Sequence, residues 1–153
     1  MPNYWLDSNV FIEAKNGYYG FEIAPGFWEA LDEHAAHGRV GSSIVVHDEL
    51  VAGDDELAQW ARERTDSFVM PDQNVQDLFN DVADYVRKTY NDPFAADFLS
   101  KADPWVIAHA LSEGNTVVTQ EVLAGKDSRK VKIPNVCREF NVRYINTCWS
   151  SWE

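Results

Sequence analysis

The feature that most restricts the fold of this chain is the alternation of short strand patterns with helix patterns. Strand patterns are expected at residues 4–6, 39–42, 116–119 and 142–145, and helix patterns at residues 8–16, 25–37, 44–50, 75–90, 104–113 and 135–140. Strands that alternate with helices are typical of an α/β layer structure with a mainly parallel sheet. In such a sheet the functional crevice lies beyond the carboxyl ends of the strands.

Residues between these elements give the expected boundaries. The polar stretch at residues 54–66 indicates a helix, and Phe68-Val69-Met70 before Pro71 indicates a break in regular structure. Asp103 is a favoured N-cap residue and Pro104 a favoured first helical residue, so Asp103 is predicted to cap the helix that follows it.

The size and composition favour one domain that spans residues 1–153. The chain has 153 residues, 45% of them hydrophobic, which is enough for a core of ordinary size. It has no apolar run of the roughly 20 residues that a membrane span needs, and its N-terminus does not resemble a secretory signal. We therefore expect a cytoplasmic protein without a membrane partner, in which Cys137 and Cys148 stay reduced.

Charge is divided unevenly along the chain. The net charge is −12, which argues against a general nucleic-acid coat protein. Residues 1–125 hold 7 basic and 22 acidic side chains, whereas residues 126–153 hold 6 basic and 3 acidic ones. The basic stretch is either a solvated loop or a phosphate-binding patch. RNA contacts, if the chain makes them, are predicted for Lys126, Arg129, Lys130 and Lys132.

Four acids fall where an α/β fold places a site. Asp7 and Glu121 follow predicted strands, Glu49 lies in the helix after the second strand, and Asp103 opens a later helix. Because parallel strands bring their carboxyl ends to one edge, these acids can converge. Gathered carboxylates repel each other unless a cation compensates them, and Mg²⁺ or Mn²⁺ prefers oxygen ligands. The reaction that best uses such a metal is hydrolysis of a phosphodiester.

The sequence around these acids resembles the PIN-domain nucleases, a family that includes the VapC-type toxins of bacterial toxin-antitoxin pairs. The matching pieces are LDSNVFI at 6–12, IVVHDEL at 44–50, ADPWVIAHAL at 102–111 and TVVTQE at 116–121. The segments YYGFEIAPGFWEAL at 18–31 and KVKIPNVC at 130–137 resemble a PIN-like subfamily that has no established activity.

This resemblance implies a PIN-like three-layer fold, with a mainly parallel central sheet flanked by helices, and a metal-dependent endoribonuclease. It implies that Asp7, Glu49, Asp103 and Glu121 bind the metal, and that Asn9 and Thr119 help to orient these acids. It also implies the toxin of a type II toxin-antitoxin pair, silenced by a small antitoxin protein. The aromatic C-terminal sequence CWSSWE at 148–153 is a candidate contact for a homodimer.

Two departures from the family pattern affect the site. The fourth acid is Glu121 where Asp is commoner, and the chain as a whole is strongly acidic. Asp48 lies beside Glu49, but successive helical residues point about 100° apart, so only one of them can face a metal, and we expect Glu49. His47 and His109 are expected to be ordinary hydrogen-bonded residues rather than ligands or proton shuttles.

Two other functional classes are compatible with the same acids. The chain could be a PIN-like protein-binding module with weak or no catalysis, whose acidic surface meets a basic partner. It could also be a magnesium-dependent phosphate-handling α/β protein, although the order Asp7-Ser8-Asn9 lacks the two Asp residues flanking one residue that such phosphatases carry.

Overall fold

The computed structural model describes residues 2–17 and 19–146. Within them the elements are β1 (Tyr4–Leu6), α1 (Ser8–Asn16), α2 (Pro25–Ala36), β2 (Val40–Ser43), α3 (Ile44–Val51), α4 (Glu56–Arg62), a 3₁₀ turn (Thr65–Ser67), β3 (Phe68–Val69), α5 (Gln73–Thr89), α6 (Phe94–Leu99), α7 (Asp103–Glu113), β4 (Thr116–Thr119), α8 (Ile133–Glu139) and β5 (Tyr144–Asn146).

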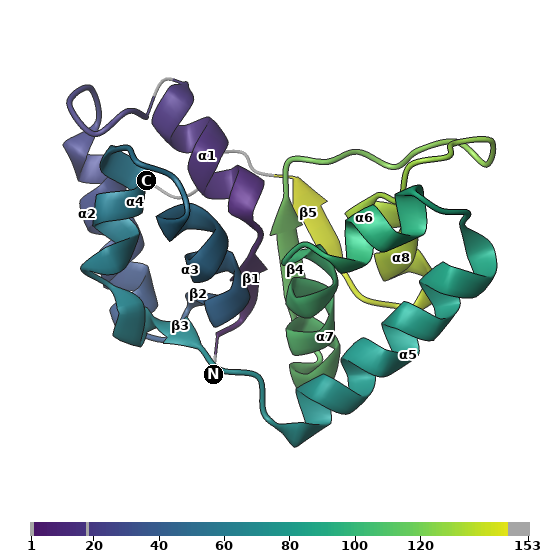
Figure 1. Ribbon diagram of the computed structural model, residues 1–153. Helices are drawn as coiled ribbons and strands as arrows, with labels where there is room; N and C mark the ends of the chain where they lie inside the picture. The colour runs from purple at the N-terminus through teal and green to yellow at the C-terminus, as the bar shows by residue number, and fades with distance from the viewer. Residues whose placement is uncertain (1, 18, 147–153) are drawn as a thin grey trace.

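The strands of the described residues form one parallel sheet with the order β3-β2-β1-β4-β5. In the centre of the sheet, Tyr4 of β1 pairs with Val40 of β2 on one side and with Thr116 of β4 on the other. Helices α1 to α4 lie on one side of the sheet and α5 to α8 on the other (Figure 1). The predicted α/β fold with a parallel central sheet between two helical layers is therefore confirmed.

The order of the strands places a crevice between β1 and β4. The chain builds outward from β1 to β2 and β3, and then crosses the sheet to β4 and β5. The direction of winding therefore reverses between β1 and β4. Parallel sheets of this kind bind ligands at such a reversal, beyond the carboxyl ends of the strands. These ends point to the top of the view in Figure 1.

The core lies on both faces of the sheet. Trp5, Leu6, Val117 and Val118 are each at most 1% exposed. The ring of Trp5 stacks on His109 of α7, with ring centroids 4.5 Å apart, so Trp5 faces the second helical layer. Since successive residues of a strand point to opposite faces, Leu6 faces α1 to α4. Burial on both faces explains why these strands read as continuous apolar runs.

Helix ends follow their local sequence signals. Ser43 caps α3 through its Oγ, which accepts a hydrogen bond from the backbone N–H of Val45, and Asp72 caps α5 in the same way. Gly114 ends α7 in the left-handed conformation, with φ at 68°, which glycine adopts at little cost. Among the described residues, no helix is long and apolar enough to cross a bilayer.

The structure corrects two expectations and adds one helix. Phe68 and Val69 form the edge strand β3 rather than a break. Pro71 lies two residues beyond the end of this strand and does not interrupt its pairing. Asp103 is the first residue of α7, and Ala102 occupies the N-cap position, so the predicted cap was wrong. Helix α6 was not expected from the sequence.

Candidate metal centre

Asp7 lies at the carboxyl end of β1, where the chain enters α1. Its Oδ1 accepts a hydrogen bond from the backbone N–H of Asn9, and its Oδ2 accepts one from Thr119 Oγ1 at 2.7 Å. The residue is only 1% exposed. Burial raises the pKa of Asp7 to about 6, and the charge of Glu121 adds to this rise, although the hydrogen bonds from Thr119 and Asn9 oppose it. An ordinary exposed aspartate would have no such cost of ionisation.

Asp103 opens α7 without capping it. The backbone of Ala102 is already helical, with φ at −73° and ψ at −18°, and no side chain of its own helix caps the N-terminus. Glu49 of α3 binds the residue before the helix, because its Oε2 accepts a hydrogen bond from the backbone N–H of Ala102 at 2.8 Å.

The surroundings of Asp103 are strongly unfavourable for its negative charge. Burial is the largest cause, followed by the charges of Asp7, Glu121 and Glu49, and together they raise the pKa of Asp103 to about 8. Lys101 opposes this rise only in part. The structure thus brings Asp7, Glu49 and Glu121 within electrostatic reach of Asp103, although 114 residues separate the first of the four acids from the last.

Glu49 reaches this cluster from α3. Its Oε1 accepts a short hydrogen bond from Ser8 Oγ, and its Oε2 binds Ala102 as described above. The neighbouring Asp48 points elsewhere, since its side chain is 69% exposed and contacts His47. Of the two adjacent acids, Glu49 is therefore the one beside Asp103. Sequence reasoning missed Ser8, although its place between Asp7 and Asn9 puts it in the same turn of the chain.

Glu121 lies two residues beyond β4. Its Oε1 accepts a hydrogen bond at 2.8 Å from the backbone N–H of Ile133, the first residue of α8. Its own backbone N–H donates to Thr119 Oγ1 at 3.0 Å, and the same hydroxyl donates to Asp7. Thr119 therefore links two of the acids. Asn9 contributes its backbone N–H to Asp7, and its side chain is exposed.

The four acids fit a hard divalent cation by their chemistry. In the part of the chain that the structure describes, no three His, Cys, Asp or Glu side chains close around a common point as a formed metal site would. Oxygens of Glu49 and Glu121 point instead to backbone N–H groups. The donors are nevertheless all carboxylate oxygens, the preferred ligands of Mg²⁺ and Mn²⁺, and a cation would relieve the repulsion around Asp103.

Asp103 and Glu121 line a cleft of about 380 Å³. Its other walls come from α6, from the link between α6 and α7, and from the loop before α8. These residues are Pro93, Phe94, Asp97, Phe98, Lys101, Lys130, Val131 and Lys132. The cleft therefore places basic side chains next to the acids, which is the arrangement that an anionic substrate of a metal site requires.

The predicted basic quartet is divided between different surfaces. Lys130 and Lys132 line the cleft beside Asp103. Lys126 lines a separate hollow that also contains Leu123, and the exposed Arg129 lines neither hollow. The loop turns between these residues, so nearness in sequence does not make one patch. The third lysine of the cleft, Lys101, comes from a distant segment that the charge count did not single out.

Both histidines near the site are packed, hydrogen-bonded residues. His109 stacks on Trp5, and its Nε2 lies 3.2 Å from Ser43 Oγ. Burial lowers the pKa of His109 to about 4, so the ring is neutral at ordinary pH. His47 contacts Asp48 and Thr65 through its two ring nitrogens.

Among the described residues, the one cysteine gives no sign of a second site. Cys137 is a free, buried thiol, and burial raises its pKa to about 12, which keeps it protonated and unreactive. The other cysteine, Cys148, lies outside the described residues. The C-terminal segment 148–153, the candidate dimer contact, also lies outside them.

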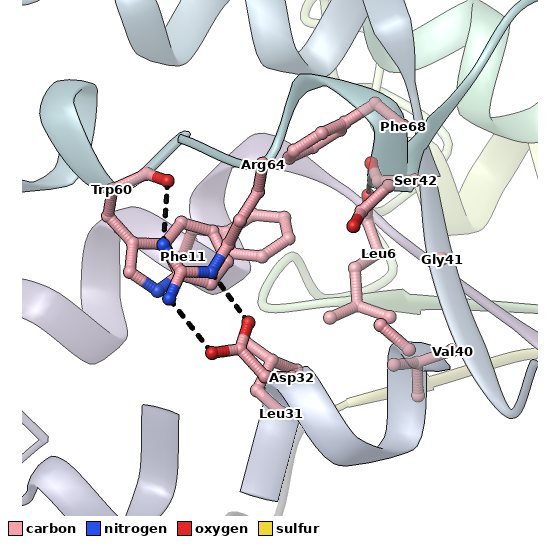
Figure 2. A pocket seen from close by; sticks show the side chains of 12 residues that line it. Leu6, Phe11, Leu31, Asp32, Val40, Gly41, Ser42, Trp60, Arg64 and Phe68 are labelled. Carbon is pink, nitrogen blue, oxygen red and sulfur yellow. Dashed lines mark hydrogen bonds and ion pairs between the residues drawn. The ribbon is translucent and has the colours of Figure 1, made fainter. Parts of the chain in front are cut away.

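A second hollow lies between β1, β2, α2 and α4, on the other helical layer (Figure 2). Its volume of about 30 Å³ holds roughly one water molecule. At its edge Arg64 forms a two-point ion pair with Asp32, with Nε–Oδ1 at 2.6 Å and Nη2–Oδ2 at 2.9 Å. The apolar lining includes Leu6 and Phe11. This hollow is a packing feature of the core, with no room for a substrate.

Comparison with known proteins gives a family and a fold. The model of the family described as "Domain of unknown function (DUF4411)" matches residues 4–149. The structure is similar to a chain in the crystal structure of VapBC2 from Rickettsia felis bound to a DNA fragment from their promoter. The TM-score is 0.54 and the identity 16%, over 96% of this chain and 99% of that chain. This likeness shows a shared fold. No curated protein matches the chain.

Proposed function

The chain belongs to the DUF4411 family, and on that premise we propose that it is a divalent-metal-dependent endoribonuclease that hydrolyses RNA phosphodiester bonds. One observation carries this proposal: Asp103 is buried beside the charges of Asp7, Glu49 and Glu121, and it lines a cleft that also contains lysines. A buried acid with a strongly raised pKa and identifiable charged neighbours is the usual mark of a functional site.

Each acid has a role in holding the cation. Asp7, Glu49, Asp103 and Glu121 would hold Mg²⁺ or Mn²⁺ through carboxylate oxygens. When bound, such a cation supplies an acidified water and neutralises charge on the leaving oxygen. Thr119 keeps Asp7 oriented by donating to Oδ2, and Ser8 does the same for Glu49 by donating to Oε1. Orienting partners of this kind raise the affinity of a metal site.

The lysines would hold the substrate. Lys101, Lys130 and Lys132 line the same cleft as Asp103, so a phosphate bound to them would lie beside the acids. These lysines reduce the electrostatic repulsion between the RNA phosphates and a chain of net charge −12 at the place where the substrate would bind. Arg129 and Lys126 would contact the RNA only outside the cleft.

The biological role that we propose is that of a toxin held silent by an antitoxin protein in the cytoplasm. The PIN-like sequence motifs support this, as does the fold shared with VapBC2, a complex that is bound to promoter DNA. A homodimer through the C-terminal segment 148–153 is part of the same proposal. A gene for a short DNA-binding protein next to the gene for this chain would support the antitoxin.

A second candidate function has its own observation. Three of the acids each hold the start of a helix: Asp7 binds the backbone N–H of Asn9 in α1, Glu49 that of Ala102, and Glu121 that of Ile133. Acids that serve the fold in this way could persist in a PIN-like module that binds a protein partner and cuts nothing. This alternative does not account for the burial of Asp103 beside three other acids, since Asp103 makes no capping hydrogen bond.

Cleavage of RNA tests the proposal against this alternative. Purified protein is incubated with mixed RNAs and Mg²⁺ or Mn²⁺, beside the variants Glu49→Gln and Asp48→Asn. These variants remove one charge each from adjacent residues, of which only Glu49 faces the cluster. We expect cutting by the wild type and by Asp48→Asn, and none by Glu49→Gln. Folded wild type that cuts no RNA, or equal cutting by all three, would refute the nuclease.

A further inference from the structure

The cleft beside Asp103 has an apolar wall that the metal chemistry does not use. Phe94, at the start of α6, and Phe98, one turn later, both line the cleft. Phe98 is buried, at 3% exposure, and belongs to the core. Phe94 is only half-buried, and no ring contact joins it to another aromatic side chain of the described residues. An aromatic ring that lines a polar cleft and stays partly exposed can act as a platform for a flat ligand.

The charged wall of the same cleft supplies sites for anions. Lys101 comes from the link between α6 and α7, whereas Lys130 and Lys132 come from the loop before α8. Lys101 Nζ lies 3.2 Å from Asp97 Oδ2, which holds the lysine at the rim, although its side chain stays 52% exposed. Lysine ammonium groups bind phosphates as point charges. The cleft therefore combines one aromatic surface with cations on two of its sides.

We propose that this cleft is a subsite for one unpaired nucleotide, whose base stacks on Phe94 while Lys101, Lys130 and Lys132 hold the adjoining phosphates. The inference rests on the proposed function and names the form of RNA that the site takes. A base in a duplex is covered by its neighbours and cannot stack on a protein ring, so the subsite selects single-stranded RNA. A cleft of about 380 Å³ has the size of a small-molecule site and does not admit a double helix.

An acidic peptide is the competing occupant of this cleft. It would use the three lysines, but it has no need of an aromatic ring at the start of α6. The two occupants therefore differ in their dependence on Phe94. An abasic RNA strand keeps the phosphates and lacks the bases. It therefore tests the same difference by changing the ligand instead of the protein.

Fluorescence anisotropy measures the affinity for RNA, and comparison of variants at Phe94 reports the contribution of stacking. The ligands are a short unstructured RNA, an abasic strand of equal length, a duplex of the same sequence, and a polyglutamate peptide. The proteins are wild type, Phe94→Leu, Phe94→Trp, and Lys88→Gln as a control for an exposed cation on α5, outside the cleft. Binding is measured in Ca²⁺, an oxygen-ligated cation, with electrophoresis to verify intact RNA, and cleavage is measured separately in Mg²⁺ and Mn²⁺.

We expect the wild type to bind the single strand about fivefold or more tightly than the abasic strand and the duplex. Phe94→Leu should remove this difference, Phe94→Trp should keep it, and Lys88→Gln should leave it unchanged. Lys132→Gln should weaken binding of the RNA and the abasic strand by the same factor, because it removes a phosphate contact and no base contact.

Equal binding of RNA by wild type and Phe94→Leu would overturn the subsite, as would equal binding of the abasic strand, the duplex or polyglutamate by the wild type. The absence of any RNA binding would do the same. Failure of the subsite is distinct from failure of the nuclease. Cleavage that is indifferent to Phe94 would refute the subsite alone, and Phe94-dependent binding without cleavage by the wild type would refute the nuclease alone.

Discussion

Asp32 and Asp103 are both carboxylates beside a hollow in this protein, but one is compensated by the chain and the other is not. Asp32 receives two hydrogen bonds from the guanidinium of Arg64, at 2.6 and 2.9 Å (Figure 2). Asp103 has Asp7, Glu49 and Glu121 around it, and Lys101 as a partial counter-charge. The charge of Asp32 is thus balanced by Arg64, whereas the single lysine beside Asp103 does not balance the four acids.

We propose that this difference separates a structural charge from a functional one. Arg64 also lies over the ring of Trp60 in α4, 4.6 Å from its centroid. Through Arg64 the ion pair therefore connects Asp32 of α2 to Trp60 of α4. The acid cluster is electrostatically unfavourable, because four carboxylates share one edge of the sheet. Proteins keep such unfavourable groupings where an external ligand offsets them. The following predictions test whether these two regions differ in the way that we propose.

The largest expected effect is on RNA cleavage. Asp103→Asn should lower kcat/KM by about 100-fold or more, because the variant keeps the shape of the side chain and loses a charge that holds the cation. Asp32→Asn makes the same chemical change beside Arg64 and should leave cleavage within about twofold of the wild type. A fluorogenic RNA measures both. Equal losses in the two variants would mean that the regions do not differ in function.

The next effect is on the pH dependence of stability without metal. The pKa of Asp103 is about 8 in the folded chain and near 3.8 in the unfolded chain. Between these values the folded chain binds more protons than the unfolded one, so stability should fall as pH rises. We expect a loss on the order of 4 kcal/mol from about pH 5 to about pH 8, to which Asp7 contributes in the lower part. Urea unfolding in chelator measures this loss.

Substitution identifies the source of that loss. Asp103→Asn should remove most of it and should therefore be more stable than the wild type at about pH 8 in chelator. Asp32→Asn should retain the slope of the wild type. A slope that survives in Asp103→Asn would show that the acid cluster is not strained.

A smaller effect is expected at Ser8. Ser8→Ala removes the hydroxyl that donates to Glu49 Oε1 and leaves the hydrogen bond from Ala102 in place. Cleavage should fall about 10-fold at limiting Mg²⁺, and saturating Mg²⁺ should recover part of it, because a positioning group acts through metal affinity. Ser112→Ala, which removes a hydroxyl that accepts from Asn74 on the outer part of α7, serves as the control. A loss that metal concentration does not change would contradict this role.

The smallest effect is on the compensated side of the molecule. Asp32→Asn should lower the free energy of unfolding by about 0.5–1 kcal/mol, since the pair with Arg64 is partly exposed. Thermal unfolding with and without Mg²⁺ measures it, and the metal should stabilise this variant as much as the wild type. A variant that no longer responds to the metal would link the two regions.

The sequence predicted those parts of the fold that depend on local patterns. β1 and β4 are continuous apolar runs, and Gly114 marks the end of α7, so their positions followed from neighbouring residues. Strand β3 has two residues, too few for a pattern, and its existence depends on pairing with Ser42 and Ser43. Local sequence patterns give no information about contacts between distant segments.

The candidate site shows the same limit. That acids would gather at the strand ends followed from the parallel sheet and from the family resemblance. That Asp103 is not a cap could not be predicted from its neighbours, because Ala102 already has helical backbone angles and binds Glu49, which is 53 residues away in the sequence. The same holds for Lys101, which joins Lys130 in one cleft only after folding. Local charge counts therefore found two of the cleft's three lysines and none of its aromatic wall.

The central claim is that Asp7, Glu49, Asp103 and Glu121 share a divalent cation, and direct binding of Mn²⁺ tests it without any substrate. Electron paramagnetic resonance of free Mn²⁺ reports binding by the wild type, by the double variant Asp7→Asn/Asp103→Asn, and by the control Asp48→Asn. We expect the wild type and Asp48→Asn to bind Mn²⁺, with displacement by Mg²⁺, and the folded double variant to lose this binding. Equal binding by all three proteins, or none by the wild type, would contradict the claim.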